Sequence, residues 1–256
     1  MDDPTRRFSS RVDNYVRYRP GYPGQVLRTL IDDCGLVPTS AVADVGSGTG
    51  ALARLFLDHG NPVFGVEPNP EMRAAAERLL HGYSNFSSVA ARAEATGLAG
   101  HSVDFVTAGQ AFHWFDRDAT RAEFARIVRP QGWVALAWNE REVRATPFLE
   151  AYEALLERFG TDYAQVDHTR RRVADEALRR FYGASFKSRS FPNQQEFDFV
   201  GARGRLLSSS YTPEPGDERF EPMLAALRTI FEAHAVDGHV RFLYRTRMYY
   251  GRLAEE

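Results

Sequence analysis

The sequence is poor in the residues that build disulfide frameworks and metal centres. Cys34 is the only cysteine in 256 residues, so no internal disulfide can form, and nothing beside it suggests a reactive thiolate. The seven histidines include no His-Glu-x-x-His motif, and no cysteine lies near the closest pair, His234 and His239. We therefore expect neither a structural disulfide nor a bound metal ion.

Long apolar runs and a strong excess of either charge are also absent. The longest apolar stretch, near 132–138, is much shorter than a membrane-spanning helix, and the first residues contain no apolar segment typical of a secretory signal. The 32 basic residues nearly balance the 34 acidic ones, whereas nucleic-acid binders carry a basic excess. We expect a cytoplasmic protein that binds neither membranes nor nucleic acids. The composition does not decide its oligomeric state, which could be a monomer or a homodimer.

The pattern of apolar residues predicts an α/β fold. With 43% hydrophobic and 26% charged residues, the chain has the composition of a soluble globular domain. Strands are expected at 41–44, 62–66, 86–91, 103–108, 133–138, 186–191 and 240–250, and helices at 25–34, 51–59, 68–80, 117–128, 147–159, 169–182, 197–209 and 218–235. We expect residues 117–128 to end at an Arg-Pro-Gln-Gly turn. Alternating strands and helices with right-handed crossovers predict a parallel, doubly wound sheet.

These elements suggest a single domain with four parts. We expect a helical cover over residues 1–40, a cofactor-binding core over 41–139, a helical insertion over 140–185 and the completion of the sheet by 186–256. The insertion separates the fifth and sixth strands, and it would lie over the crevice at the end of the sheet.

One stretch, AVADVGSGTG at 41–50, carries most of the information about function. An apolar strand ends at Asp44 and is followed by Gly46, Gly48 and Gly50, with a helical segment directly behind them. Because glycine has no Cβ and tolerates positive φ, such a turn lets backbone N–H groups approach a ligand closely. The stretch therefore predicts a site for a nucleotide-type cofactor.

Two acidic residues bear on which cofactor binds there. Asp44 would repel a pyrophosphate but would form a charge-assisted hydrogen bond with the α-ammonium group of S-adenosylmethionine. Glu67 follows the second strand, 21 residues after Gly46, where a carboxylate can accept both hydroxyls of an adenosine ribose. Ala51 completes a loose dinucleotide pattern with the glycines, so a nicotinamide cofactor stays open as an alternative.

Two motifs resemble those of a known enzyme family. DVGSGTG at 44–50 resembles the first motif of class I S-adenosylmethionine-dependent methyltransferases. AFHWFD at 111–116 resembles a signature of the type 11 methyltransferase-domain family, in a small-molecule subgroup related to the trans-aconitate enzymes. The resemblance implies a Rossmann-like doubly wound sheet of seven strands, mostly parallel, with its last strand antiparallel at the sheet edge. It implies S-adenosylmethionine as cofactor and a small-molecule methyl acceptor as the partner.

The resemblance also implies roles for individual residues. Asp44 would hold the amino group of the methionine moiety and Arg19 its carboxylate, while the backbone at Gly46, Gly48 and Gly50 approaches the ligand. The other expected cofactor contacts are Glu67 at the ribose, Met72, Ala93 and Glu94 at the adenine, and Gln110 and Phe112 at the methionine moiety. Tyr15 and Tyr18 would line the methyl-transfer pocket, and His113 and Trp114 would border the acceptor.

Several of these assignments have structural alternatives. The Tyr/Arg-rich leader could be a packed amphipathic segment, Met72 could be a core residue, and Phe112, Trp114 and Phe115 could be core aromatics, which is the interpretation we favour for Phe115. Arg92 departs from the family pattern, which usually has a small or acidic residue there, so its contact with adenine is left open.

Methyl transfer by in-line displacement needs alignment and the exclusion of water more than acid–base groups. His113 is the candidate to deprotonate or to position the acceptor, and the sequence leaves both roles open. The competing hypotheses are a nicotinamide-dependent oxidoreductase and a non-catalytic binding module with the same fold.

Overall fold

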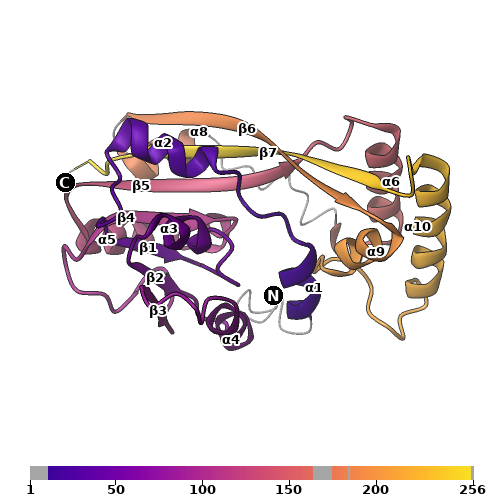
Figure 1. Cartoon of the computed structure of the whole chain (residues 1–256), viewed down its shortest axis with the longest axis horizontal. Helices are drawn as coiled ribbons and strands as arrows, with labels where there is room; N and C mark the ends of the chain where they lie inside the picture. The colour runs from indigo at the N-terminus through magenta and orange to yellow at the C-terminus, as the bar shows by residue number, and fades with distance from the viewer. Residues whose placement is uncertain (1–10, 164–174, 184, 255–256) are drawn as a thin grey trace.

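The computed structural model describes residues 11–163, 175–183 and 185–254, and over these the chain forms a seven-stranded sheet with helices on both faces (Figure 1). The strands are β1 (Val42–Val45), β2 (Val63–Val66), β3 (Phe86–Val89), β4 (Val103–Gly109), β5 (Val128–Arg141), β6 (Phe186–Phe197) and β7 (Val240–Gly251). The helices are α1 (Val12–Tyr18), α2 (Gln25–Cys34), α3 (Ala53–His59), α4 (Pro70–Leu79), α5 (Arg117–Ile127), α6 (Pro147–Phe159), α8 (Asp175–Tyr182), α9 (Phe199–Leu207) and α10 (Phe220–His234), with a short 3-10 turn, η3, at Phe112–Trp114. Residues 169–174 of the helix expected at 169–182 lie outside the described residues.

The strand order is β3-β2-β1-β4-β5-β7-β6, which confirms the doubly wound Rossmann-like fold. Strands β1 to β5 are mutually parallel, and β7 is antiparallel to both of its neighbours. The expected position of β7 at the sheet edge is wrong, because β7 lies between β5 and β6. The consecutive residues Met248 to Tyr250 near its end are all buried, so both faces of the strand are covered there, as expected for an inner strand. Strand β6, in contrast, is largely exposed.

The turn expected at Arg-Pro-Gln-Gly is instead part of β5. Val128 already pairs with Val103 of β4, and Trp133 pairs with Phe105, so β5 advances five residues while β4 advances two. The extra residues form a bulge, in which Gln131 has a φ of 69°. The strand therefore begins five residues earlier than the apolar run predicted.

Two apolar clusters cover the two faces of the sheet. On one face Phe124 of α5 and Phe181 of α8 pack with the strands, and on the other Leu30 of α2 and Phe56 of α3 do so. All four strand positions of β1 are buried as a result. Burial on both faces explains why β1 is apolar at every position except Asp44.

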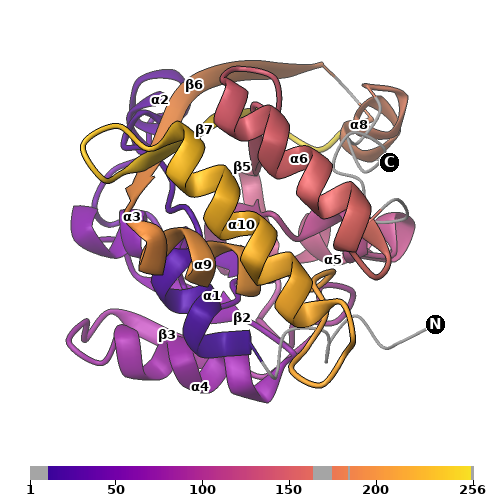
Figure 2. The ribbon, with the colours of Figure 1, turned by 90° about the vertical axis from the view of Figure 1, so that its right-hand side faces the viewer.

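A third cluster holds a helical layer beyond the sheet. The long strands β6 and β7 extend past the other strands, and α6, α9 and α10 pack there around residues such as Tyr152, Met223 and Phe242 (Figures 1 and 2). This layer differs from the expected insertion at 140–185, since it draws two of its three helices from residues after 186. The helix α8 packs instead on α5 and the main sheet, because Leu178, Phe181 and Tyr182 face that core.

The leader helix α1 connects the main sheet and its helices to the helical layer formed by α6, α9 and α10. Val12 packs against Met72 and Ala75 of α4, while Tyr18 packs edge-on against Phe197 at a ring distance of 6.0 Å. Arg11 fastens the start of the helix by donating to the carbonyl of Ser209 at 2.6 Å. The segment therefore bridges from α4 to the helical layer.

Substituting Gly204 with alanine should loosen this bridge. A Cβ at Gly204 would lie 2.0–2.4 Å from ring atoms of Tyr18, so the buried ring would have to move. We expect a loss of about 1–3 kcal/mol in the free energy of unfolding, measured by urea denaturation. Gly24→Ala is the matched control, since its Cβ meets no atom within 4 Å. Equal stability of the two variants would show that the Tyr18 ring is not held in place.

Candidate active site

The candidate site lies where the order of the strands reverses. Strands β1 and β4 are neighbours in the sheet although β2 and β3 separate them in sequence, and in such sheets ligands bind outside the carboxyl ends of the two strands. Two adjoining cavities are found there, with volumes of about 180 Å³ and 120 Å³. Both are lined by Tyr15, Gly46, Gly48, Gly109, Gln110 and Trp114, so they form one crevice.

The glycine loop brings backbone close to this crevice. Gly46 and Gly48 have φ values of 67° and 56°, and a Cβ at Gly46 would lie 2.5 Å from the Cβ of Ala111. Gly50 behaves differently from the expectation, because it lines neither cavity and faces the side chain of Leu80. Its lack of a side chain serves the packing of the loop against α4 rather than access to a ligand.

Asp44 forms the floor of the larger cavity. The residue is completely buried, and its Oδ1 accepts a hydrogen bond of 3.0 Å from the hydroxyl of Thr107 on β4. Its Oδ2 is buried and accepts no hydrogen bond from the described residues. Burial raises the pKa of Asp44 to about 7, although the bond from Thr107 and the nearby backbone N–H of Ala53 oppose this shift. The cavity thus has a carboxylate that lacks part of its hydrogen bonding.

Glu67 stands between the glycine loop and the smaller cavity. Its Oε2 accepts from the backbone N–H of Gly48 at 2.9 Å and its Oε1 from that of Asn69 at 2.8 Å, which holds the carboxylate in place. Burial raises its pKa, and the two amides partly offset that effect. The smaller cavity continues past Glu67 along Met72, Ala93, Glu94, Arg92 and Phe115.

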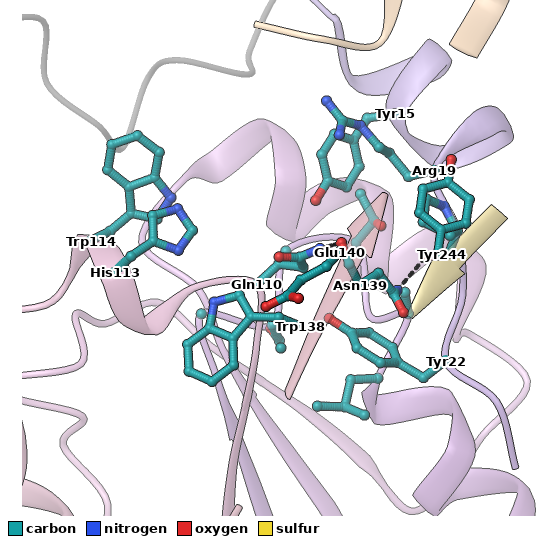
Figure 3. Close-up of a pocket in the computed structure, with 18 of the residues that line it drawn as sticks. Tyr15, Arg19, Tyr22, Gln110, His113, Trp114, Trp138, Asn139, Glu140 and Tyr244 are labelled. Carbon is teal, nitrogen blue, oxygen red and sulfur yellow. Dashed lines mark hydrogen bonds between the residues drawn. The ribbon is translucent and has the colours of Figure 1, made fainter. Parts of the chain in front are cut away.

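The end of β4 is strained toward the crevice. Gln110 has a φ of 56°, unusual for a residue with a side chain, and its Nε2 donates to the carbonyl of Asn139 at 2.9 Å. Asn139 in turn donates to the carbonyl of Gly21 in the leader at 3.1 Å. The ends of β4 and β5 and the leader are therefore tied together around the cavity (Figure 3).

Most of the expected ligand-facing residues line the crevice. Figure 3 shows His113 and Trp114 across the larger cavity from Tyr15 and Arg19, and all four line it. The stretch from Glu67 through Met72 to Ala93 and Glu94 lines the smaller one.

Three aromatic expectations differ from the structure. Phe112 lines neither cavity; it is completely buried, with its ring 4.5 Å from that of Phe181, and belongs to the core. Phe115, expected in the core, instead lines the smaller cavity. Tyr18 also lines neither cavity, since its ring packs against Phe197 and Gly204. Tyr22 takes the expected position of Tyr18 at the larger cavity.

Comparison with known proteins bears on this geometry. Residues 43–136, which include the glycine loop, Glu67 and the end of β4, match a family model described as a methyltransferase domain. This segment belongs to the methyltransferase-domain family.

Relatives of the methyltransferase domain occur in distant organisms. An uncharacterized methyltransferase of Schizosaccharomyces pombe is 32% identical over 60% of each chain, and one of Mycobacterium tuberculosis is 36% identical over 56% of each. The match thus spans less than two thirds of the length of these curated relatives.

Solved structures extend the likeness in fold to nearly the whole chain. An Anaeromyxobacter dehalogenans protein, provisionally named a type II methyltransferase, has a TM-score of 0.66 at 22% identity and covers 93% of this chain and 100% of its own. Phosphoethanolamine N-methyltransferase 2 of Haemonchus contortus, solved with S-adenosyl-L-methionine, has a TM-score of 0.56 at 15% identity and covers 98% of this chain and 59% of its own. Both likenesses show the class I methyltransferase fold.

Several residues around the larger cavity escaped the sequence analysis. They are Tyr22, Trp138, Asn139, Glu140, Arg141, Arg205, Tyr211, Tyr244 and Tyr249. A partial signal was available for Arg205, because α9 is small and apolar apart from its two arginines, Arg203 and Arg205. Nothing in the local sequence marks Arg141 or Tyr244, which reach the cavity through the pairing of β5 with β7.

The described part of the chain contains no cluster of three or more histidine, cysteine, aspartate or glutamate side chains that could hold a metal ion. Within the same residues no helix combines the length and apolar character needed to span a bilayer.

Proposed function

We propose that this protein transfers a methyl group from S-adenosylmethionine to a small-molecule acceptor by in-line displacement. The observation that carries the proposal is Asp44, which lines the larger cavity and whose buried Oδ2 accepts no hydrogen bond from the described residues. A cationic ammonium group satisfies such an oxygen, whereas a diphosphate would be repelled by it. The family of residues 43–136 supports the same cofactor.

The residues along the crevice suit the rest of that cofactor. Arg19 lines the larger cavity near Tyr15, where its guanidinium can pair with the methionine carboxylate. Glu67, held by two backbone amides, is placed to accept the ribose hydroxyls. Adenine would lie in the smaller cavity against Met72, Ala93 and Phe115, with Glu94 at its edge.

For methyl transfer the protein mainly has to align the acceptor with the cofactor and exclude water from the site. The cofactor supplies a methyl group on a positively charged sulfur, and attack by the acceptor breaks only that sulfur–carbon bond. Tyr15, Tyr22, Trp114 and Trp138 wall the larger cavity and exclude water, and aromatic faces near a cation stabilise it by about 0.5–2 kcal/mol. His113 lines the same cavity and is our candidate to position or deprotonate the acceptor.

Calorimetric titration with S-adenosylhomocysteine tests the proposal. We expect binding by the wild-type protein and binding at least tenfold weaker by Glu67→Gln, because the amide puts a donor against one of two backbone N–H groups and removes an acceptor for ribose. Glu232→Gln, which changes an exposed side chain on α10, is the control and should bind as the wild type does. Absence of binding by the wild type, or tighter binding of NADH, would overturn the proposal.

A further inference from the structure

The larger cavity ends in a group of three arginines that we call the arginine cluster: Arg19, Arg141 and Arg205. They come from the leader, the end of β5 and α9, which are far apart in the sequence. Arg205 is 3% exposed and the side chain of Arg141 only 2% exposed, so both guanidinium groups are removed from water. Buried arginines are normally paired with anions, because an unpaired buried charge is costly.

The protein itself satisfies this cluster only in part. Arg141 pairs with Glu153 and donates to the hydroxyl of Tyr163 through Nη2, but its buried Nε and Nη1 have no hydrogen-bond partner among the described residues. Arg205 donates to the hydroxyl of Tyr244 at 2.9 Å and to that of Ser209 at 3.3 Å. Both of these acceptors are neutral, and no described carboxylate pairs with Arg205.

The excess positive charge of the arginine cluster shifts the pKa values of groups within and beside it. Burial lowers the pKa of Arg19, and repulsion from Arg205 lowers it further. Burial alone would raise the pKa of the Tyr211 phenol, yet the three arginines of the cluster, together with a hydrogen bond with Ser209, bring it below its ordinary value. The potential at this end of the cavity is therefore positive, and an anion placed there would relieve repulsion between the guanidinium groups.

Two acidic residues near this end of the cavity already have cationic partners. Glu153 pairs with Arg141, and Glu140 pairs with Arg247 at 2.7 Å. In the proposed function Asp44 binds the ammonium group of the cofactor and Arg19 its carboxylate. Arg205 and the two unpartnered nitrogen atoms of Arg141 are then left for a different ligand.

We propose that the methyl acceptor carries an oxyanion, a carboxylate or a phosphate, which binds between Arg141 and Arg205; this rests on the proposed function. The oxyanion is an anchor rather than the atom that is methylated, because charge-assisted hydrogen bonds from two guanidinium groups stabilise its lone pairs and make them poor nucleophiles. Specificity for an anionic small molecule would thus come from the arginine cluster, and the reacting atom would lie elsewhere on the same molecule.

Binding of simple anions to the protein saturated with S-adenosylhomocysteine tests this inference. The probes are succinate for the carboxylate arm, inorganic phosphate for the phosphate arm, and succinamide as a neutral analogue of succinate. We expect calorimetry to detect at least one of the two anions and no succinamide. Arg205→Gln should reduce the affinity for that anion about tenfold or more, and Arg205→Lys, which keeps the charge, should reduce it less.

Controls separate this inference from a fault in folding or in the proposed function. Arg228→Gln, an exposed arginine on α10, should bind the anion as the wild type does. The Arg205 variants should bind S-adenosylhomocysteine within about threefold of the wild type, and Arg141→Gln provides a second variant if Arg205→Gln does not fold. If S-adenosylhomocysteine fails to bind the wild type, the proposed function fails. If it binds, but neither anion binds better than succinamide, or the Arg205 variants bind anions normally, the oxyanion site is overturned.

Discussion

Replacing Asp44 with asparagine is expected to weaken S-adenosylhomocysteine binding by about 100-fold while making the free protein more stable. Asparagine keeps the shape and can still accept from Thr107, but it cannot neutralise an ammonium group in a buried site. Loss of binding with a gain in stability separates a functional carboxylate from a structural one, since loss of a structural carboxylate lowers both.

The gain in stability follows from the raised pKa of Asp44. Its folded-state pKa of about 7 lies above the ordinary value of 3.8, so between these values the folded chain holds a proton that the unfolded chain has released. Stability of the free wild-type protein therefore falls as the pH rises from about 4 to 7. Asp44→Asn removes this loss, and its advantage should grow over that window to about 2–4 kcal/mol at pH 8.

Thermal and urea unfolding at pH 4.5 and pH 8, together with calorimetry at pH 8, measure both effects. Asp118→Asn, a 71% exposed residue on α5, is the control and should change neither quantity. Wild-type affinity should also fall as the pH drops below about 7, because the protonated carboxyl no longer attracts the ammonium group. Unchanged binding by Asp44→Asn would remove the observation on which the proposed function depends.

Replacing Gly46 with alanine should cost both stability and binding. At a φ of 67° a side chain is strained by about 1–2 kcal/mol, and the added Cβ would lie 2.5 Å from the Cβ of Ala111, which no rotamer change can relieve. Either the glycine loop or the start of η3 must shift, and both line the crevice. We expect a total loss of about 2–5 kcal/mol in the free energy of unfolding and no measurable S-adenosylhomocysteine binding.

Gly97→Ala isolates the contribution of the clash. Gly97 has a similar φ of 72°, but a Cβ there would meet no atom within 4 Å. This variant should lose only the backbone term, about 1–2 kcal/mol, and should bind the ligand normally. The comparison uses urea unfolding curves of the two variants, which should have the same slope, followed by calorimetric titration with S-adenosylhomocysteine. Equal losses in the two variants would mean that Ala111 yields without cost and that the loop is not closely packed.

Errors in the sequence-based fold arise where distant segments meet. The antiparallel direction of β7 was expected, yet its place between β5 and β6 depends on pairing with residues more than 40 positions away. The bulge at Gln131 depends likewise on the register with β4. Phe112 and Phe115 exchanged their expected roles because Phe181 of α8 packs against Phe112 and leaves Phe115 at the crevice. Local periodicity contains no information on such partners.

The sequence by itself determined the parallel doubly wound core and the positions of Asp44, the glycine loop and Glu67, because each follows directly from a strand end and its turn. Only the tertiary structure decided that Tyr22 replaces Tyr18 at the cavity and that Arg141 and Arg205 meet there. These two arginines lie on different elements, and their incomplete pairing exists only once the helical layer has packed over the end of the sheet. Residues close together in the sequence thus specify the cofactor half of the crevice. The half that we assign to the acceptor is specified by charged residues that are far apart in the sequence and become buried together in the fold.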